Sequence, residues 1–201
     1  MARRAYVTRL AARSPDDIAV IQNAIDSGEI EPNSIVTILG KTEGNGCVND
    51  FTRAFAVRAL RDLLAAHVGR SKAEQIAMVM SGGTEGCLSP HWIVFEARET
   101  NEAPRGMALA LGVARTPELP FEHLGRRGQV QMVAEAVRAA MQDAGIKDPK
   151  NCHYVQVKCP LLTSERIQEV ALRNKTVSVQ DTLKSMSVSR AASALGVALA
   201  L

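Results

Sequence analysis

Hydrophobic and polar positions follow two different periods in the first half of the chain. Short, mostly apolar runs predict strands, and longer stretches in which apolar residues return every three or four positions predict helices. The predicted elements are, in order, a strand at 5–11, a helix at 14–28, a strand at 34–39, a helix at 51–68, and strands at 75–80 and 91–97. Strands that alternate with helices indicate an α/β or α+β fold.

Both helices carry signals of their own. Ser14 is expected to cap the first helix, with Pro15 in its first turn and Gly28 at its end. His67 in the second helix is expected to be a packed or surface residue rather than a ligand. The side chains expected on or near the core side of that helix are Phe55, Leu60, Leu63, Leu64 and His67.

The second half of the chain repeats the order of strand, helix and strand. It predicts a strand at 105–116, a helix at 130–145 and a strand at 153–162. The polar stretch at 99–106 contains Pro and Gly and suits a linker. We therefore predict two structural repeats, one at 1–103 and one at 104–201.

Composition narrows the function classes. The 201 residues are 46% hydrophobic and 22% charged, as in an ordinary globular protein. A net charge of +3 with 3% aromatic residues does not favour nucleic-acid binding. No C-x-x-C pattern supports a zinc module, and the four cysteines are expected to be reduced. The longest apolar stretch, Ala191 to Leu201, falls short of the ~20 residues of a membrane span, so no membrane partner and a cytoplasmic location are expected.

The motif "MSGGTEG" places Ser81 at the end of a predicted strand and surrounds it with glycines. Glycine lets a ligand approach the backbone closely, so the N–H groups of Gly82 and Gly83 could bind a carbonyl oxygen or a developing oxyanion. A tight turn is the alternative interpretation.

A serine nucleophile needs a base. Two lysines that end apolar strands, Lys41 and Lys158, are candidates, because partial burial near other cations lowers the pKa of an amine. A side chain that extends to solvent is the alternative for each lysine. The four histidines are the other candidates: His67, His91, His123 and His153.

The pair Gly40-Lys41 followed by Thr42 invites a phosphate-binding interpretation. A P-loop needs another glycine five residues earlier, and that position is Ile35. Two arginines, Arg53 and Arg190, lie in segments rich in small side chains. Each guanidinium offers paired donors to carbonyl or carboxylate oxygens. Surface positions are the alternative for both arginines.

Four long motifs resemble the cyanuric acid hydrolase and barbiturase family, the ring-opening amidohydrolases. The motifs are "GKTEGNGCVNDFTR", "MSGGTEGCLSPHW", "VQVKCPLLT" and "SRAASALGVALA". The resemblance is closer to cyanuric acid hydrolase and covers nearly the whole chain. It implies three repeats around a pseudo-threefold axis, each supplying a serine, a lysine and an arginine to a central site.

The resemblance implies roles for individual residues. Lys41, Arg53, Ser81 and Gly82 would hold the substrate, and Arg190 would do the same from the second repeat. Lys158 would be the catalytic base of a nucleophilic serine.

That serine is expected beyond Leu201, and the third repeat is missing. The chain is therefore expected to be a fragment of a longer enzyme or to lack activity.

The resemblance also sets expectations for partners. The substrate would be a cyclic imide, cyanuric acid or else barbituric acid, and the protein a homo-oligomer, namely a tetramer. No organic cofactor is expected, and the family's structural divalent metal would belong to the missing third repeat.

Overall fold

The computed structural model describes residues 2–83, 88–102, 106 and 108–201. The fold is mixed α/β, with one sheet and several helices, as the sequence predicts. The chain forms two compact units, residues 1–111 and 112–201, and each is described by itself. Part of the glycine motif, Thr84 to Gly86, and part of the predicted linker lie outside the described residues.

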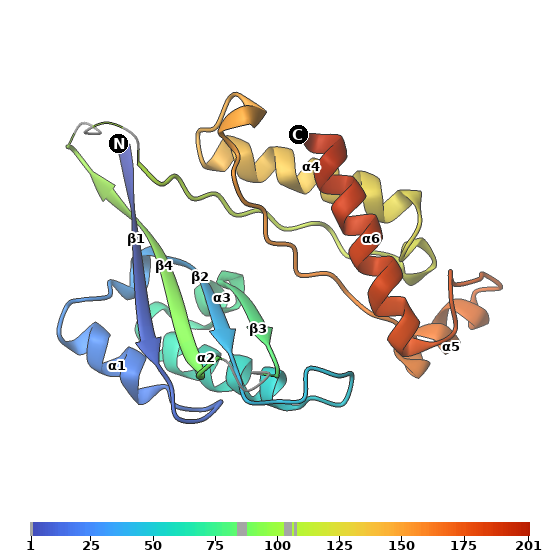
Figure 1. Ribbon diagram of the computed structural model, residues 1–201, viewed down its shortest axis with the longest axis horizontal. Coiled ribbons are helices and arrows are strands. Elements are labelled where there is room, and N and C mark those ends of the chain that lie inside the picture. The colour runs from blue at the N-terminus through green and yellow to red at the C-terminus, as the bar shows by residue number, and fades with distance from the viewer. Residues whose placement is uncertain (1, 84–87, 103–105, 107) are drawn as a thin grey trace. The chain divides into compact units, whose positions relative to one another are not determined.

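The first unit contains the sheet and three α-helices (Figure 1). Its elements are β1 Ala2–Ala11, α1 Ala19–Asp26, η1 Pro32–Ser34, β2 Ile35–Lys41, α2 Thr52–Val68, α3 Arg70–Gln75, β3 Ala77–Ser81 and β4 His91–Thr100. The four strands and α2 confirm the predicted elements of this half, and α1 confirms the predicted helix at 14–28 over a shorter range. The short helix α3 was not predicted.

The strand order in the sheet is β1-β4-β2-β3. β4 is antiparallel to both β1 and β2, whereas β3 is parallel to β2 and is reached through α2 and α3. Parallel neighbours require such a crossover connection. Consequently β2 and β3 end at the same edge of the sheet, with Lys41 opposite Ser81.

The core lies between the helices and one face of the sheet. Alternate residues of β4, including Trp92 and Val94, are fully buried, as expected for a strand with one covered face. On α2 the buried stripe is Ala56, Leu60 and Leu64. Phe55 was predicted on or near the core side, but it is 52% exposed because it lies one position away from this stripe.

The start of α1 differs from the prediction. The helix begins at Ala19 with Ile18 at the N-cap position, so the expected cap at Ser14 is wrong. The Ser14 hydroxyl instead donates to the Asp16 carboxylate at 2.7 Å, and Asp17 accepts from the Arg13 N–H at 2.9 Å. These short polar side chains stabilise a turn before the helix rather than its first turn.

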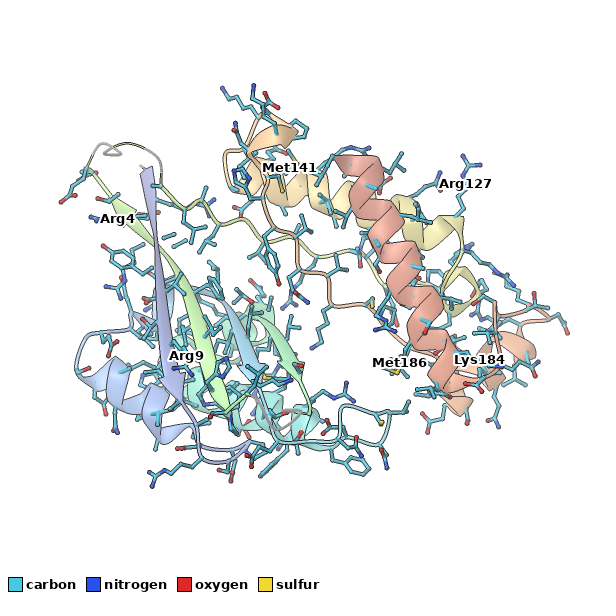
Figure 2. The ribbon with its side chains drawn as sticks, viewed as in Figure 1. Arg4, Arg9, Arg127, Met141, Lys184 and Met186 are labelled. Atoms are coloured by element: carbon cyan, nitrogen blue, oxygen red, sulfur yellow. The ribbon has the colours of Figure 1, made fainter. Side chains whose placement is uncertain are left out.

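The edge strand β1 carries exposed arginines, of which Arg4 and Arg9 are labelled in Figure 2. The Arg4 guanidinium lies 3.4 Å from the Glu102 carboxylate and 5.7 Å from the ring centre of Tyr6. Charges on an edge strand disfavour pairing with a further strand.

The second unit is built from helices and extended segments. Its elements are η2 Phe121–His123, α4 Arg127–Asp143, η3 Pro149–Asn151, α5 Ser164–Leu172 and α6 Thr182–Ala200. The predicted helix at 130–145 is confirmed by α4. The predicted strands are wrong at 108–116 and 153–162, where the described residues have no ladder partner and form no strand. Residues 105 and 107 of the first predicted strand lie outside the described residues.

Helices α4 and α6 pack against each other through small and polar side chains. The amide of the buried Gln129 donates to the hydroxyls of Ser189 and Ser193 at 3.0 and 3.1 Å. A Cβ at Gly196 would lie 2.6 Å from the Val133 side chain, so glycine permits the close approach.

Among the described residues, none of the helices combines the length and the apolar character that crossing a bilayer requires.

Candidate functional site

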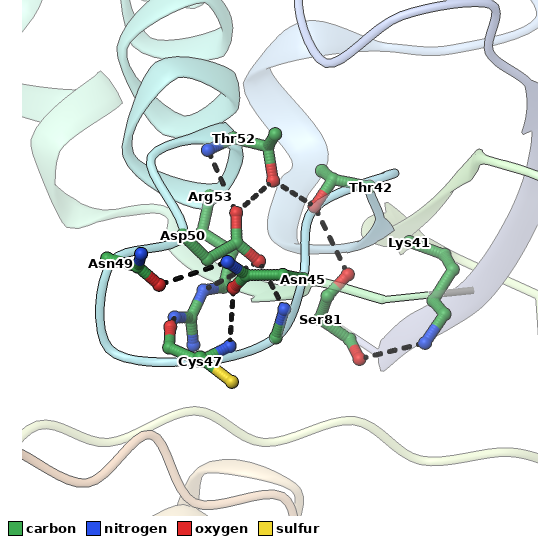
Figure 3. A network of polar contacts seen from close by, with 10 residues as sticks. Lys41, Thr42, Asn45, Cys47, Asn49, Asp50, Thr52, Arg53 and Ser81 are labelled. Carbon is green, nitrogen blue, oxygen red and sulfur yellow. Dashed lines mark hydrogen bonds and ion pairs between the residues drawn. The ribbon is translucent and has the colours of Figure 1, made fainter. Parts of the chain in front are cut away.

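Lys41 and Ser81 meet at the edge of the sheet where β2 and β3 end. The Lys41 ammonium nitrogen lies 3.3 Å from the Ser81 hydroxyl oxygen (Figure 3). Ser81 is exposed and Lys41 is half-buried, so a ligand has access to the hydroxyl. A lysine donor beside a serine hydroxyl can bind a carbonyl oxygen or serve proton transfer.

Thr42 follows Lys41 and is buried. Its N–H donates to the Ser81 carbonyl at 2.8 Å, and its hydroxyl lies 2.9 Å from the Thr52 hydroxyl. The hydroxyl of Thr42 therefore contacts groups of the protein itself, and Gly40-Lys41 belongs to a strand. A P-loop, already disfavoured by the spacing, does not fit this geometry.

Asp50 forms the centre of a polar network at the start of α2 (Figure 3). Its side chain is fully buried, and it accepts hydrogen bonds from the N–H of Gly46 at 2.8 Å and the N–H of Thr52 at 3.0 Å. The Thr52 hydroxyl donates as well, at 2.5 Å. Burial raises the pKa of the Asp50 carboxyl, but these hydrogen bonds and the Arg53 charge outweigh it and keep the pKa below the ordinary value.

Three glycines surround this carboxylate. A Cβ at Gly44 or at Gly82 would lie 2.0 or 1.9 Å from an Asp50 oxygen, and one at Gly82 would also lie 2.6 Å from the Gly46 backbone. Gly46 itself has φ +70°, which other residues rarely adopt. Gly82 therefore has a packing reason to be glycine, in addition to the ligand approach proposed from the sequence.

Arg53 lies beside the Asp50 carboxylate in the first turn of α2. Its Nε is 3.6 Å from Asp50 Oδ2, and its terminal nitrogen donates to the Cys47 carbonyl. The side chain keeps 27% exposure, so the guanidinium is held on one side and accessible on the other. The structure thus gathers Lys41, Arg53, Ser81 and Gly82 in one region of the first unit.

Two of the candidate histidines, His91 and His67, are engaged by other groups. The His91 ring nitrogen Nδ1 lies 2.7 Å from the Ser89 carbonyl, and His67 Nε2 lies 2.9 Å from the Gln22 side chain. The His67 contact agrees with its expected packing role.

The other two predicted site residues belong to the second unit. Lys158 is exposed on the extended segment before α5. Arg190 is exposed on α6, where its guanidinium donates to the Ser187 hydroxyl at 3.4 Å.

No set of three or more His, Cys, Asp or Glu side chains in the described part of the chain is arranged to hold a metal ion.

The residues that the sequence analysis missed are Asp50, Thr42 and Thr52. An available signal was the pattern Asp50-x-Thr52 directly before a helix, since Asp and Thr often bond to backbone N–H groups at helix starts. Nothing in the sequence, however, indicated that Asp50 would be buried against Gly82.

Comparison with known proteins extends these observations. The model of the amidohydrolase ring-opening protein family matches residues 6–201. A cyanuric acid amidohydrolase from Bradyrhizobium sp. (strain ORS 375) is 66% identical over 99% of this chain and 55% of the relative. Another, from Azorhizobium caulinodans, is 58% identical over 98% of this chain and 55% of the relative. The chain thus spans about half the length of these curated relatives.

Solved structures agree. The crystal structure of the cyanuric acid hydrolase from A. caulinodans superposes with a TM-score of 0.93 at 57% identity, covering 98% of this chain and 55% of that one. A structure described as "Cyanuric acid hydrolase: evolutionary innovation by structural concatenation" superposes with a TM-score of 0.94 at 43% identity. The match covers 100% of this chain and 56% of that one. With a family model that matches nearly its whole length, this chain belongs to the ring-opening amidohydrolases.

Proposed function

We propose that this chain is part of a cyanuric acid amidohydrolase, which hydrolyses one C–N bond of the cyclic imide ring. The observation that carries the proposal is the Lys41–Ser81 contact beside Arg53, in a chain 66% identical to a cyanuric acid amidohydrolase. Three kinds of donor gather there: an ammonium, a guanidinium and a hydroxyl. They suit a planar ring that presents carbonyl oxygens.

In the proposed reaction, a serine oxygen attacks a ring carbonyl carbon while its proton passes to a lysine amine. Backbone N–H groups stabilise the oxyanion, the ring C–N bond breaks, and the lysine returns the proton to the leaving nitrogen. Water then attacks the acyl-serine ester and releases the opened acid. Lys158 is proposed as the base that takes the proton of the attacking serine, and that serine is proposed to lie outside residues 1–201.

Lys41, Arg53, Ser81 and Gly82 are proposed to hold the ring rather than to break it. Arg53 would donate to one carbonyl, and Lys41 and Ser81 to another. Arg190 is proposed to bind the ring from the second repeat.

The repeat organisation is part of the same proposal. Residues 1–103 would form the first repeat and 104–201 part of the second, around a pseudo-threefold axis. The wording "structural concatenation" used for a solved relative, and the two compact units of this chain, support it. We also propose a homo-oligomer, expected to be a tetramer, which light scattering on the purified protein measures directly.

The test is turnover of cyanuric acid and barbituric acid by the protein at its natural length, followed by mass spectrometry of the opened product. Consumption of cyanuric acid with barbituric acid untouched supports the proposal. The reverse preference would replace it with barbiturase activity, and no turnover of either ring would reject it.

A further inference from the structure

We propose that Asp50 is a positioning residue for substrate binding, acting through Arg53 and the backbone around Gly82. The inference rests on the proposed function, because it concerns the site that would bind the cyclic imide. Asp50 cannot touch a substrate, since its side chain is fully buried. Its effect must therefore pass through the groups that it holds.

The first such group is the guanidinium of Arg53. A guanidinium on a flexible side chain binds a carbonyl well only when its plane is already oriented, because ordering it on binding costs conformational entropy. The Asp50 carboxylate at 3.6 Å and the Cys47 carbonyl hold two sides of this group. The exposed remainder is left for a ligand.

The second group is the backbone that follows Ser81. Gly82 is buried directly against an Asp50 oxygen, and Gly46, whose N–H donates to the same oxygen, lies beside Gly82. The loop after β2 and the end of β3 therefore meet at this carboxylate. The backbone that presents Ser81 is fixed relative to Arg53 by this contact.

A chain of hydroxyl contacts also connects Asp50 with the backbone of Ser81 (Figure 3). Thr52 donates to Asp50, the Thr42 hydroxyl lies 2.9 Å from that of Thr52, and the Thr42 hydroxyl also lies 3.2 Å from the Ser81 carbonyl oxygen. Removing the charge of Asp50 should weaken both connections between Arg53 and Ser81.

The substitution that tests this is Asp50→Asn, which keeps the size of the side chain but replaces one of its two acceptor oxygens with a donor. Both carboxylate oxygens accept from N–H groups, so whichever oxygen becomes an NH₂ group faces a donor. We expect the affinity for cyanuric acid, measured as KM in steady-state turnover by the protein at its natural length, to fall about tenfold, as for a lost charge-assisted hydrogen bond. The matched control is Asp62→Asn, in an exposed Asp–Arg pair on α2, which should leave the affinity unchanged.

A double-mutant cycle separates positioning from general stability. If Asp50 acts through Arg53, then Asp50→Asn should weaken binding much less in an Arg53→Met background than in the wild type. Equal losses in both backgrounds, or unchanged affinity in Asp50→Asn, would overturn the proposal. If Arg53→Met alone leaves the affinity intact, the failure lies instead in the proposed function of this site.

Thr52 provides a second route should Asp50→Asn not fold. Thr52→Val removes the hydroxyl that donates to Asp50, whereas Thr52→Ser retains it. We expect weaker cyanuric acid binding in the valine variant and restored binding in the serine variant. Wild-type affinity in both would contradict the positioning role.

Discussion

The ammonium nitrogen of Lys41 lies 3.3 Å from the hydroxyl oxygen of Ser81, although 40 positions separate the two residues in the chain. The contact exists because β2 and β3 are parallel neighbours whose register places these residues opposite each other. Both side chains therefore project from the same end of two adjacent strands, beside the loop that contains Asp50. A shift of the register by one residue would separate them.

Lys41→Met tests the binding role of this pair. The affinity for cyanuric acid should fall at least about tenfold, because a charged donor to a carbonyl is lost. The melting temperature should change little, since the side chain is only half-buried. Lys72→Met on α3 is the control, because that exposed lysine donates to the Asn33 carbonyl away from the pair. The KM values of both variants in steady-state turnover check the difference, and equal affinities would contradict it.

Gly82→Ala should destabilise the first unit by about 1–3 kcal/mol, the usual cost of overpacking. The new methyl group would be placed 1.9 Å from Asp50 Oδ2 and 2.6 Å from the Gly46 backbone. Urea denaturation measures the loss. The same substitution in an Asp50→Ala background should cost less, because one of the two obstacles is gone. A cost that is equal in both backgrounds would mean that the carboxylate does not fill this space.

Acid sensitivity should depend on Asp50. Its pKa in the folded chain lies below the ordinary value of 3.8, so the unfolded chain binds a proton there more readily. The stabilisation is complete above that ordinary value and is lost as the pH falls through the lower folded pKa. Denaturation at pH 7 and at about pH 3 should therefore show a smaller difference in unfolding free energy for Asp50→Asn than for the wild type. A pH dependence in Asp50→Asn that is parallel to that of the wild type would refute this assignment.

Gln129→Leu should destabilise the α4–α6 packing by about 1–3 kcal/mol, since the buried hydroxyls of Ser189 and Ser193 would lose their amide partner. Gln142→Leu makes the same replacement at an exposed position of α4 and should change the unfolding free energy little. Thermal denaturation of both variants compares them. Similar melting temperatures would show that the Gln129 network contributes little.

Local patterns predicted most elements of the first unit because its helices and strands have clear periods. Leu60 and Leu64 of the buried stripe on α2 were predicted from the sequence, and the apolar run Trp92 to Phe95 predicted β4, although its alternate burial is seen only in the structure. The predicted helix cap failed at Ser14, because its hydroxyl bonds to Asp16 in a turn before the helix. The predicted strand failed at 153–162, because that apolar segment has no strand to pair with. Burial pattern is a property of one segment, whereas strand pairing needs two.

The residue types of the candidate site can be read from the sequence: a lysine and a serine at strand ends, glycines after the serine, and an arginine at a helix start. Long motifs around them were sufficient to identify the family. The contact of Lys41 with Ser81 and the burial of Asp50 against Gly82 become known only from the folded chain, because both depend on the parallel pairing of β2 with β3. Residues so distant in sequence become neighbours through the sheet, which no local pattern encodes.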